Sequence, residues 1–429
     1  RMWGGVPLYV SSSFALYSER LQLPIEETIP VMGFGSEFGT MSADDSSVLM
    51  ENGQPGEAGK YTYRDVTTTN PGTFNQWLYD SSTDSDMMTH YFDALYYYAF
   101  NADKTGYEVL PSMAASFPTP IEGRETESGK QVSRTWQVEL RDDLVWTYFD
   151  GTDTSGFAAD HEVIDANDFL FTFETGLAEG WFRAISGGGD FLTEAQAIVN
   201  AQEFVDGTKE FSEVGLRMID ETTLEFEFLN EQSEWNVKYW LSSFVMTPVH
   251  EDLYNADPVA YGTAPETIAY HGAYMVTYYE ADKVLRLVEN PNFHSPERYF
   301  YTGRNFSIII DTEIRFQEFL DGKLEAIGVP SSKVTTYLND PRLKKIVGSS
   351  VRRLNYNGLG TVEAQKEVFP DSDYVPEPLL ANQNFKMAMF HVIDREKLAL
   401  DIIKTQVPVM YLFSEAYLVD AELGIPYRN

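Results

Sequence analysis

The feature that most constrains the fold of this chain is a change of hydrophobic period, from two to helical, between the stretches "WQVELRDDLVW" and "DANDFLFTFE". Trp136, Val138 and Leu140 alternate with polar residues, which is typical of a half-buried strand. Asp165 stands directly before the second stretch, where it can cap a helix. The pair predicts a strand, a polar loop with an exposed Trp146, and a capped helix.

The same alternation of strand and helix patterns continues along the chain. It predicts a strand at 61–70 stopped by Pro71, a helix leading into an aromatic strand at 87–100, hairpins at 215–229 and 270–293, and a helix over 382–403. Segment 306–330 is expected to be a strand, a helix and a parallel strand. Its helix should turn four residues inward: Ile314, Phe316, Phe319 and Leu320. These elements indicate an α/β protein.

Size and charge limit the class of protein further. With 429 residues the chain is too long for one ordinary core and predicts two or three domains, with a polar linker at 41–59. The 66 acidic residues exceed the 31 basic ones, for a net charge of −35. Such a surface repels phosphate backbones, so we expect no nucleic-acid partner.

Several kinds of chemistry have no support in the sequence. The chain has no cysteine, which excludes disulfides and thiolate sites. Its six histidines lack metal-ligand spacing and no nucleotide-binding motif is present, so we expect no cofactor or metal. Paired acids such as Asp142 and Asp143, or Asp311 and Glu313, are explained mostly by caps and turns. A glycoside hydrolase that uses two carboxylates stays open as an alternative.

The order of short motifs from residue 60 onward resembles the family 5 extracellular solute-binding proteins, the oligopeptide- and dipeptide-binding components of ABC importers. The motifs that carry the resemblance are "LYYYAF", "LRDDLVW", "DANDFLFTFE", "MIDETTLEFEF", "FVMTPVHEDLY", "HGAYMV", "VENPNF", "DGKLEAIGVP" and "NFKMAMFHVIDREKL". The resemblance implies an α/β, two-lobed periplasmic-binding-protein-like (type II) fold with a hinge, whose lobes close around a ligand.

Within this resemblance the chain is expected to divide into four parts. Residues 1–40 resemble the segment near the family's C-terminus, and residues 6–20 should then form a strand and a helix packed on the first lobe. After the linker, residues 60–303 would form lobe I, with a smaller subdomain at about 100–215. Residues 304–429 would form part of lobe II, which looks incomplete.

The resemblance also implies where a ligand would bind. In peptide-binding members an extended peptide bonds to strand edges through its backbone. The edge expected here is Thr67, Thr68, Thr69 and Asn70; an ordinary edge strand blunted by Pro71 is the alternative. The other residues expected near the cleft are Tyr97, Tyr98, Tyr274, Phe293 and Asn357. The family's acidic residue for the ligand ammonium has no match in the chain.

The function that these expectations describe is capture of oligopeptides outside the cell and delivery to an ABC transporter, without catalysis. An oligosaccharide cargo, held by stacking on Trp and Tyr, is the alternative within the family. Expected partners are the peptide and the permease subunits, and the expected state is a monomer. The location would be extracellular, at the cell surface or in the periplasm, with a lipid anchor implied by the family although this chain has no cysteine to acylate.

Overall fold

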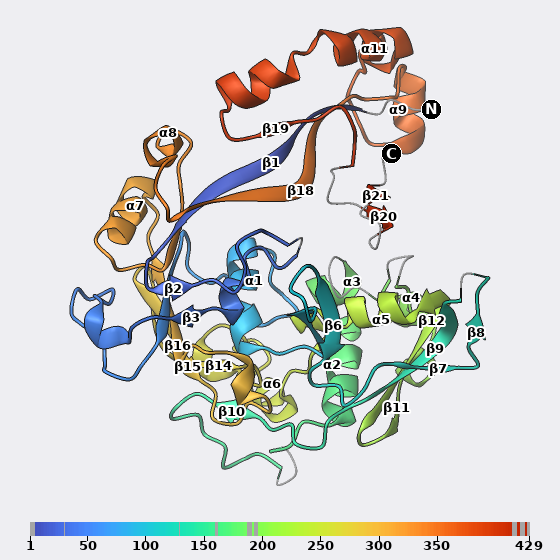
Figure 1. Ribbon diagram of the computed structural model, residues 1–429. Helices are drawn as coiled ribbons and strands as arrows, with labels where there is room; N and C mark the ends of the chain where they lie inside the picture. Colours follow the sequence, from blue (N-terminus) through green and yellow to red (C-terminus); the bar gives the residue numbers. More distant parts are fainter. Residues whose placement is uncertain are drawn as a thin grey trace. The chain divides into compact units, whose positions relative to one another are not determined.

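The computed structural model describes residues 5–29, 31–127, 129–158, 162–186, 191–192, 196–413, 418–420 and 425–426. These residues divide into two compact units (Figure 1). Unit 1 comprises residues 1–19, 26–34 and 326–429, and unit 2 comprises residues 20–25 and 35–325. These units were not predicted from the sequence. The predicted division of the chain at residues 41, 60 and 304 stays a prediction.

Unit 1 is built around β1 (Gly5–Tyr17). Along one edge β1 pairs antiparallel with β18 (Leu343–Asn355), and on its other edge with β17 (Ala326–Gly328) and β19 (Val407–Pro408). The described helices of this unit are α8 (Val334–Tyr337), α9 (Val362–Val368), α10 (Pro378–Ala381), α11 (Gln383–Val392) and a π-helix (Lys397–Ile402), and its last strands are β20 (Leu418–Asp420) and β21 (Ile425–Pro426).

The prediction for residues 6–20 is confirmed for the strand and wrong for the rest. β1 continues to Tyr17 without a helix, because antiparallel pairing with β18 and β17 runs along its whole length. Its partners are strands from residue 326 onward and not strands of the predicted first lobe, residues 60–303.

Unit 2 contains two larger sheets. One has the order β11-β12-β9-β7, with β8 also paired to β9, and the other has the order β14-β15-β16-β4. Their strands are β4 (Thr62–Thr67), β7 (Thr119–Ile121), β8 (Arg124–Glu125), β9 (Gln131–Glu139), β11 (Leu216–Asp220), β12 (Thr223–Ser233), β14 (Tyr274–Glu280), β15 (Val284–Glu289) and β16 (Gly303–Ile308). Smaller pairs are β2 (Leu21–Gln22) with β3 (Thr40–Met41), β5 (Tyr96–Phe100) with β6 (Tyr107–Pro111), and β10 (Thr147–Tyr148) with β13 (Ala269–Tyr270).

The described α-helices of unit 2 are α1 (Ser82–Tyr91), α2 (Ala166–Ala178), α3 (Phe182–Ile185), α4 (Ala201–Val205), α5 (Glu234–Trp240), α6 (Glu251–Ala256) and α7 (Thr312–Leu320), and an aromatic core lies against α2. In the core, the ring of Phe191 lies 5.9 Å from Trp77 and 5.1 Å from Phe173, and all three are buried. These contacts join α2 to segments far away in the sequence.

Most local predictions are confirmed. Both hairpins form, and α2 begins with the expected cap, in which the Asn167 amide donates to Asp165 (2.7 Å) and the Asp165 amide to Asp168 (3.0 Å). Trp146, however, is buried, because its ring packs against His250 and His271. The predicted exposure of Trp146 is wrong.

Two predictions beyond residue 305 need correction. β17 does not pair in parallel with β16; β16 pairs in parallel with β4, and β17 joins β1. In α7, Phe316 and Phe319 are buried as predicted, but Ile314 (54% exposed) and Leu320 (42%) are not. Ile314 lies two residues before Phe316, which places it on the opposite face of the helix.

The helix predicted over 382–403 is interrupted. α11 ends at Val392, and the Asp394 carboxylate caps a new turn by accepting from the Lys397 amide (2.9 Å). The interruption lets Arg395 turn inward, where its guanidinium donates to the carbonyls of Pro7 (2.7 Å) and Phe390 (2.8 Å). Arg395 thereby fixes the end of α11 to β1.

Candidate functional site

The predicted ligand edge lies at the end of β4, which has one strand neighbour, β16, among the described residues. Thr302 donates to the Tyr61 carbonyl (3.1 Å) and Ile309 to the Thr67 carbonyl (2.9 Å), so the odd-numbered residues of β4 bond toward β16. The backbone N–H and C=O groups of successive residues point alternately to the two sides of a strand. Those of Thr62, Arg64 and Val66 therefore point away from β16, to the outer edge.

The first part of this outer edge is occupied by unit 2 itself. The Thr62 amide donates to the Asp45 carboxylate (3.0 Å), and the Arg64 carbonyl accepts from the Glu325 amide (2.8 Å). Thr68 and Thr69 are exposed and take part in no hydrogen bond in the described part of the chain. The edge is therefore closed at its start and open at its end.

The exposed stretch Thr68–Thr69 is held at its C-terminal end by Asn70. The Asn70 side chain accepts from the Asp282 amide (2.7 Å) and donates to the Asp282 carboxylate (2.8 Å). Asp282 has a φ of 61° in the turn between β14 and β15. These two bonds hold the chain after Thr69 against the neighbouring hairpin, so the exposed stretch has a defined course.

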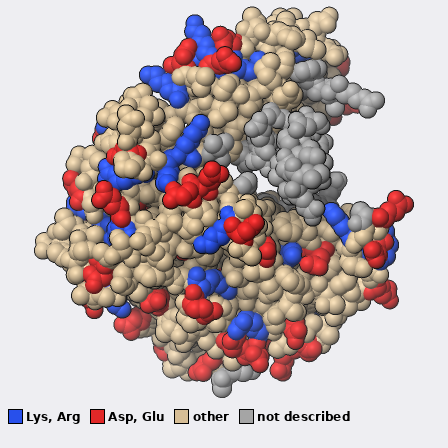
Figure 2. Space-filling view, viewed as in Figure 1, with Lys and Arg blue, Asp and Glu red and all other residues tan. Residues whose placement is uncertain are grey.

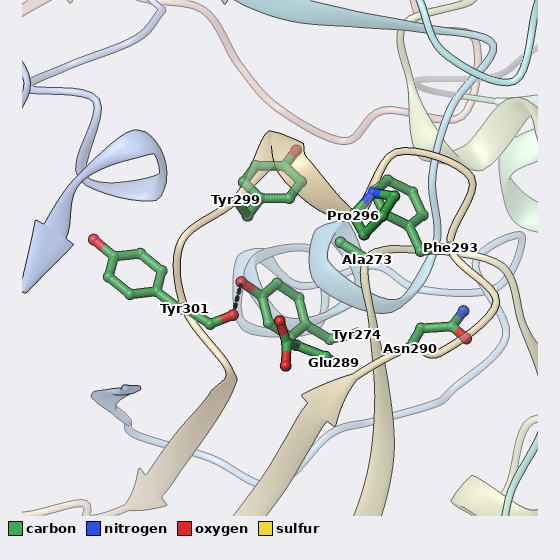
Figure 3. A pocket seen from close by; sticks show the side chains of 8 residues that line it. All are labelled: Ala273, Tyr274, Glu289, Asn290, Phe293, Pro296, Tyr299 and Tyr301. Atoms are coloured by element: carbon green, nitrogen blue, oxygen red, sulfur yellow. Dashed lines mark hydrogen bonds between the residues drawn. The ribbon is translucent and has the colours of Figure 1, made fainter. Parts of the chain in front are cut away.

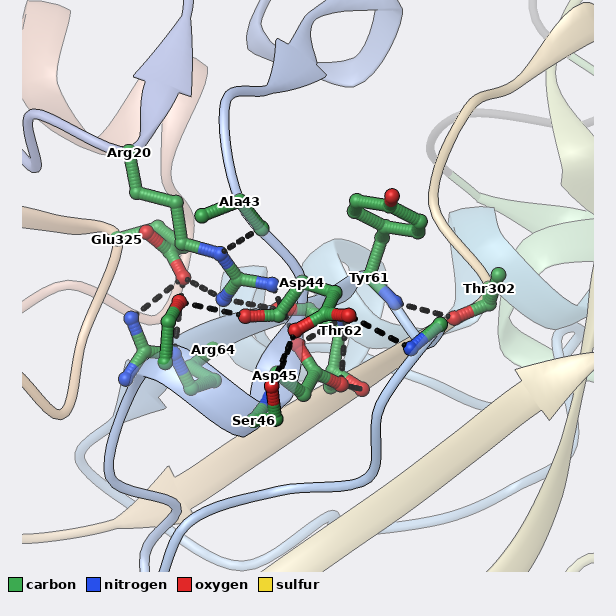
Figure 4. Close-up of polar contacts among 12 residues, drawn as sticks. Arg20, Ala43, Asp44, Asp45, Ser46, Tyr61, Thr62, Arg64, Thr302 and Glu325 are labelled. Atoms are coloured by element: carbon green, nitrogen blue, oxygen red, sulfur yellow. Dashed lines mark hydrogen bonds and ion pairs between the residues drawn. The ribbon is translucent and has the colours of Figure 1, made fainter.

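A buried ion network anchors the base of β4 (Figure 4). The Glu325 carboxylate accepts from Arg20 (2.8 Å) and from Arg64 (2.6 Å), and Arg20 also pairs with Asp45. All four side chains are at most 6% exposed. Burial lowers the pKa of Arg64, while the Glu325 charge acts in the opposite direction. The alternating sequence pattern gave no sign of this network.

Tyr97 lies in a second polar cluster. Its ring faces the Arg298 guanidinium at 3.9 Å, and Phe293 lies 5.2 Å from the same group. Arg298 also bonds Ser112 (2.7 Å) and Asp93 (3.3 Å). Burial alone would raise the pKa of Asp93, but the bond from His294 and the Arg298 charge lower it below the usual value. Tyr97 and Phe293, two of the predicted residues, thus meet around one cation.

Tyr274 and Phe293 line one small cavity with Tyr299 and Tyr301 (Figure 3). The Tyr274 hydroxyl donates to the Tyr301 carbonyl (3.1 Å), and Tyr274 and Phe293 are buried. The cavity volume is about 20 Å³, which suits a water molecule and not a peptide side chain.

A larger hollow lies beside β14, β15 and β16, with a volume of about 460 Å³. Its lining includes two basic residues, Lys60 and Arg286, and three acidic ones, Asp45, Glu57 and Glu289. Of these charged residues, only Glu289 belongs to a motif singled out in the sequence, "VENPNF". On the face shown in Figure 2, acidic and basic side chains are likewise interspersed.

Tyr98 belongs to an aromatic group on β5, β6 and α5. Its ring contacts Tyr107 (5.6 Å between centroids) and Tyr239 (6.2 Å), and Trp235 contacts both of these rings in turn. Ser242 donates to the Tyr98 hydroxyl (3.0 Å), and burial raises the pKa of Tyr98 to about 12.

Asn357 lies in unit 1, unlike the other predicted residues. Its side chain accepts from the Leu359 amide (2.9 Å) and donates to Gln365 (3.1 Å), so it supports its own turn. No group of three His, Asp or Glu side chains that could hold a metal ion occurs among the residues the structure describes. Nor does any described helix have the length and apolar character needed to cross a membrane.

Solved structures with a similar fold are peptide-binding components of importers and receptors. "Structure and mode of peptide binding of pheromone receptor PrgZ" is matched with a TM-score of 0.58 at 18% identity, over 81% of this chain and 59% of that chain. The substrate-binding domain of an oligopeptide ABC transporter from Bacillus anthracis is matched with a TM-score of 0.52 at 18% identity, over 66% and 48%. The fold of the chain is thus type II periplasmic-binding-protein-like.

The family follows from the sequence comparison. The family described as "Bacterial extracellular solute-binding proteins, family 5 Middle" matches residues 108–418, and the chain belongs to this family. The oligopeptide-binding protein AliA of Streptococcus pneumoniae is 21% identical over 79% of this chain and 48% of its own length. A dipeptide-binding protein of Lactococcus lactis is 23% identical over 64% and 45%. The chain thus spans about half the length of the curated relatives it matches.

Proposed function

We propose that this protein binds oligopeptides as the extracellular receptor of an ABC importer and catalyses no reaction. Membership of a solute-binding family supports the proposal, as do the relatives named as oligopeptide-binding proteins. The proposed partners are a peptide and the permease subunits. The proposed location is the cell surface or the periplasm, and the proposed state is a monomer.

The observation that carries the proposal is the open end of the β4 edge. Thr68 is exposed and, by the same alternation, directs its backbone groups to the outer edge, where a second extended chain could pair with them; Asn70 holds the stretch in place. Pairing through the backbone tolerates many side chains, as a receptor for mixed peptides requires. Tyr97, Tyr98, Tyr274, Phe293 and Asn357 stay predicted ligand neighbours.

Titration calorimetry of the full chain with penta-alanine tests this proposal. Thr68→Pro removes one edge N–H, and the extended Thr67 before it tolerates a proline neighbour. Thr68→Ala is the matched control, because it keeps the N–H. We expect Thr68→Pro to weaken binding by about tenfold or more and Thr68→Ala to change it little. Equal affinities for the two variants would refute binding at this edge.

One observation favours the oligosaccharide alternative. Trp235 and Tyr239 stack at 6.3 Å with 29° between their planes and are 44% and 48% exposed. Aromatic faces with polar tips suit sugar rings as well as apolar side chains. Maltopentaose in the same calorimetric assay separates the two cargoes, because Trp235→Ala would abolish its binding and leave that of penta-alanine unchanged.

A further inference from the structure

The chain contains two Asn-Gly pairs, Asn52-Gly53 and Asn357-Gly358. In such a pair the backbone nitrogen of the glycine can attack the side-chain amide carbon of the asparagine, because glycine has no Cβ to obstruct the approach. The attack requires the glycine amide to lose its proton. A hydrogen bond that this amide donates within the fold therefore protects the pair, and the surroundings of the two glycine amides decide which pair reacts.

The pair Asn52-Gly53 is protected in this way. The Gly53 amide donates to the Met50 carbonyl (2.8 Å), and the Met50 amide donates to the Gln54 carbonyl (2.8 Å). Gly53 has a φ of 75°, so the two bonds close a tight turn. The proton that would have to leave the Gly53 nitrogen is engaged, and we expect this pair to react slowly.

The surroundings of Asn357-Gly358 are the opposite. Gly358 is exposed, and its amide donates to no acceptor in the part of the chain that the structure describes. The side-chain oxygen of Asn357 accepts from the Leu359 amide (2.9 Å). This bond folds the side chain toward its own backbone and draws electron density from the amide carbon. The attacking nitrogen is therefore free, and the carbon that it attacks is polarised.

We propose that Asn357 is a site of spontaneous deamidation. The Gly358 nitrogen loses its proton and bonds to the side-chain amide carbon of Asn357, and the side-chain nitrogen leaves with a proton as ammonia. The resulting cyclic imide takes up water, which opens it at either of its carbonyls to give aspartate or isoaspartate. The sum of the steps consumes water and releases ammonia, with no other reactant.

The modification changes the local structure of unit 1. Asn357 donates to Gln365 (3.1 Å), a buried residue of α9. A carboxylate has no proton to donate, so deamidation breaks this bond between the turn after β18 and α9 and adds a negative charge beside it. Isoaspartate also inserts the side-chain methylene into the backbone of the turn. The modified turn therefore loses its attachment to α9.

Peptide mapping by mass spectrometry tests the proposal on the full chain, incubated in mildly alkaline buffer either folded or unfolded in urea. The urea sample gives the rates of the two pairs without the fold. Relative to these rates, we expect Asn357 to react about fivefold or more faster than Asn52 in the folded chain, because a hydrogen bond protects only the Gly53 amide. Equal relative rates at the two pairs would overturn the inference.

Gly358→Ala is the matched variant, because nothing lies within 4 Å of a Cβ at this position and the fold can accept it. The added methyl group obstructs the attack and should slow deamidation of Asn357 by about tenfold or more, with Asn52 unaffected. Unchanged deamidation of Asn357 in this variant would contradict attack by the Gly358 nitrogen. Neither result depends on peptide binding, so the test is independent of the proposed function.

Discussion

The guanidinium of Arg20 donates to the carboxylate of Glu325 over 2.8 Å, and both side chains are buried. Arg20 is the first residue of unit 2 after β1, and Glu325 is the last residue of unit 2 before β17. Directly beyond them, Tyr17 of β1 pairs with Ala326 of β17 in unit 1. Two of the four points at which the chain passes from one unit to the other, at residues 19–20 and 325–326, are thus flanked by a contact within each unit.

Glu325→Gln should destabilise unit 2 strongly. It removes the carboxylate, which leaves the buried Arg64 guanidinium without its counter-charge and Arg20 with Asp45 alone. Breaking one side of a buried ion pair costs about 3–5 kcal/mol. Urea denaturation measures the loss. Glu318→Gln is the control, because its pair with Lys323 is partly exposed and should contribute less than about 1 kcal/mol. Equal losses would mean that the network is not a stabilising anchor.

Removal of the N-terminal cap of α2 should have a smaller effect on stability. Asp165→Ala removes the acceptor of the Asn167 amide and should lower the free energy of unfolding by about 1 kcal/mol. Glu174→Ala, at an exposed position of the same helix, should change it by less than about 0.5 kcal/mol. Thermal denaturation of both variants checks the difference. A loss in Glu174→Ala as large as that in Asp165→Ala would contradict the capping account.

Local elements such as this cap could be predicted from sequence because their causes lie within a few residues. Asp165 and Asp168 stand beside the amides they accept from. Strand partners could not be predicted in this way. The period of two in β1 and β17 indicates strands, but only long-range contacts decide that β17 joins β1 and not β16.

The candidate site shows the same limit. A strand that stops before Pro71 could be predicted from the sequence, although β4 already ends at Thr67. The use of Thr67–Asn70 as a ligand edge stays a prediction. The bond between the Asp65 carboxylate and the Val66 amide could not be predicted, since it depends on the side-chain rotamer and on which edge faces β16. Tyr274 and Phe293 looked like cleft residues, and the structure buries both beside a cavity of water size.

Gly272, in the motif "HGAYMV", should not tolerate a side chain. A Cβ there would lie 2.5 Å from the Tyr91 carbonyl carbon and 2.7 Å from the Phe92 amide nitrogen, both of which are backbone atoms. Gly272→Ala should therefore cost about 1–3 kcal/mol, measured by urea denaturation. Gly156→Ala is the control, because nothing lies within 4 Å of its Cβ position. A stable Gly272→Ala variant would show that α1 and the β13–β14 turn pack less closely than described.

His271 should make stability depend on pH. Burial lowers the pKa of His271 to about 4, against 6.5 for the free side chain. Between these values the unfolded chain binds the proton and the folded one does not, so stability falls as the pH drops from 6.5 toward 4. The His271 contribution to the loss should be of the order of 3 kcal/mol.

His271→Gln is the matched variant for this effect, because its side-chain oxygen can still accept from the Asp93 amide as the His271 ring does (3.2 Å). Denaturation curves from pH 4 to pH 7 should show a smaller pH dependence in the variant than in the unaltered protein. Identical pH profiles would contradict the burial of a neutral imidazole at this position.

The measurement that tests the central claim most directly is amide hydrogen exchange over residues 61–72, with and without saturating penta-alanine. If a peptide adds to the open end of β4, exchange of the Thr68 amide, which points to the outer edge, should slow on binding. The amide of Thr62, already bonded to Asp45, should be unaffected. Unchanged exchange at Thr68 in the presence of bound peptide would contradict the account.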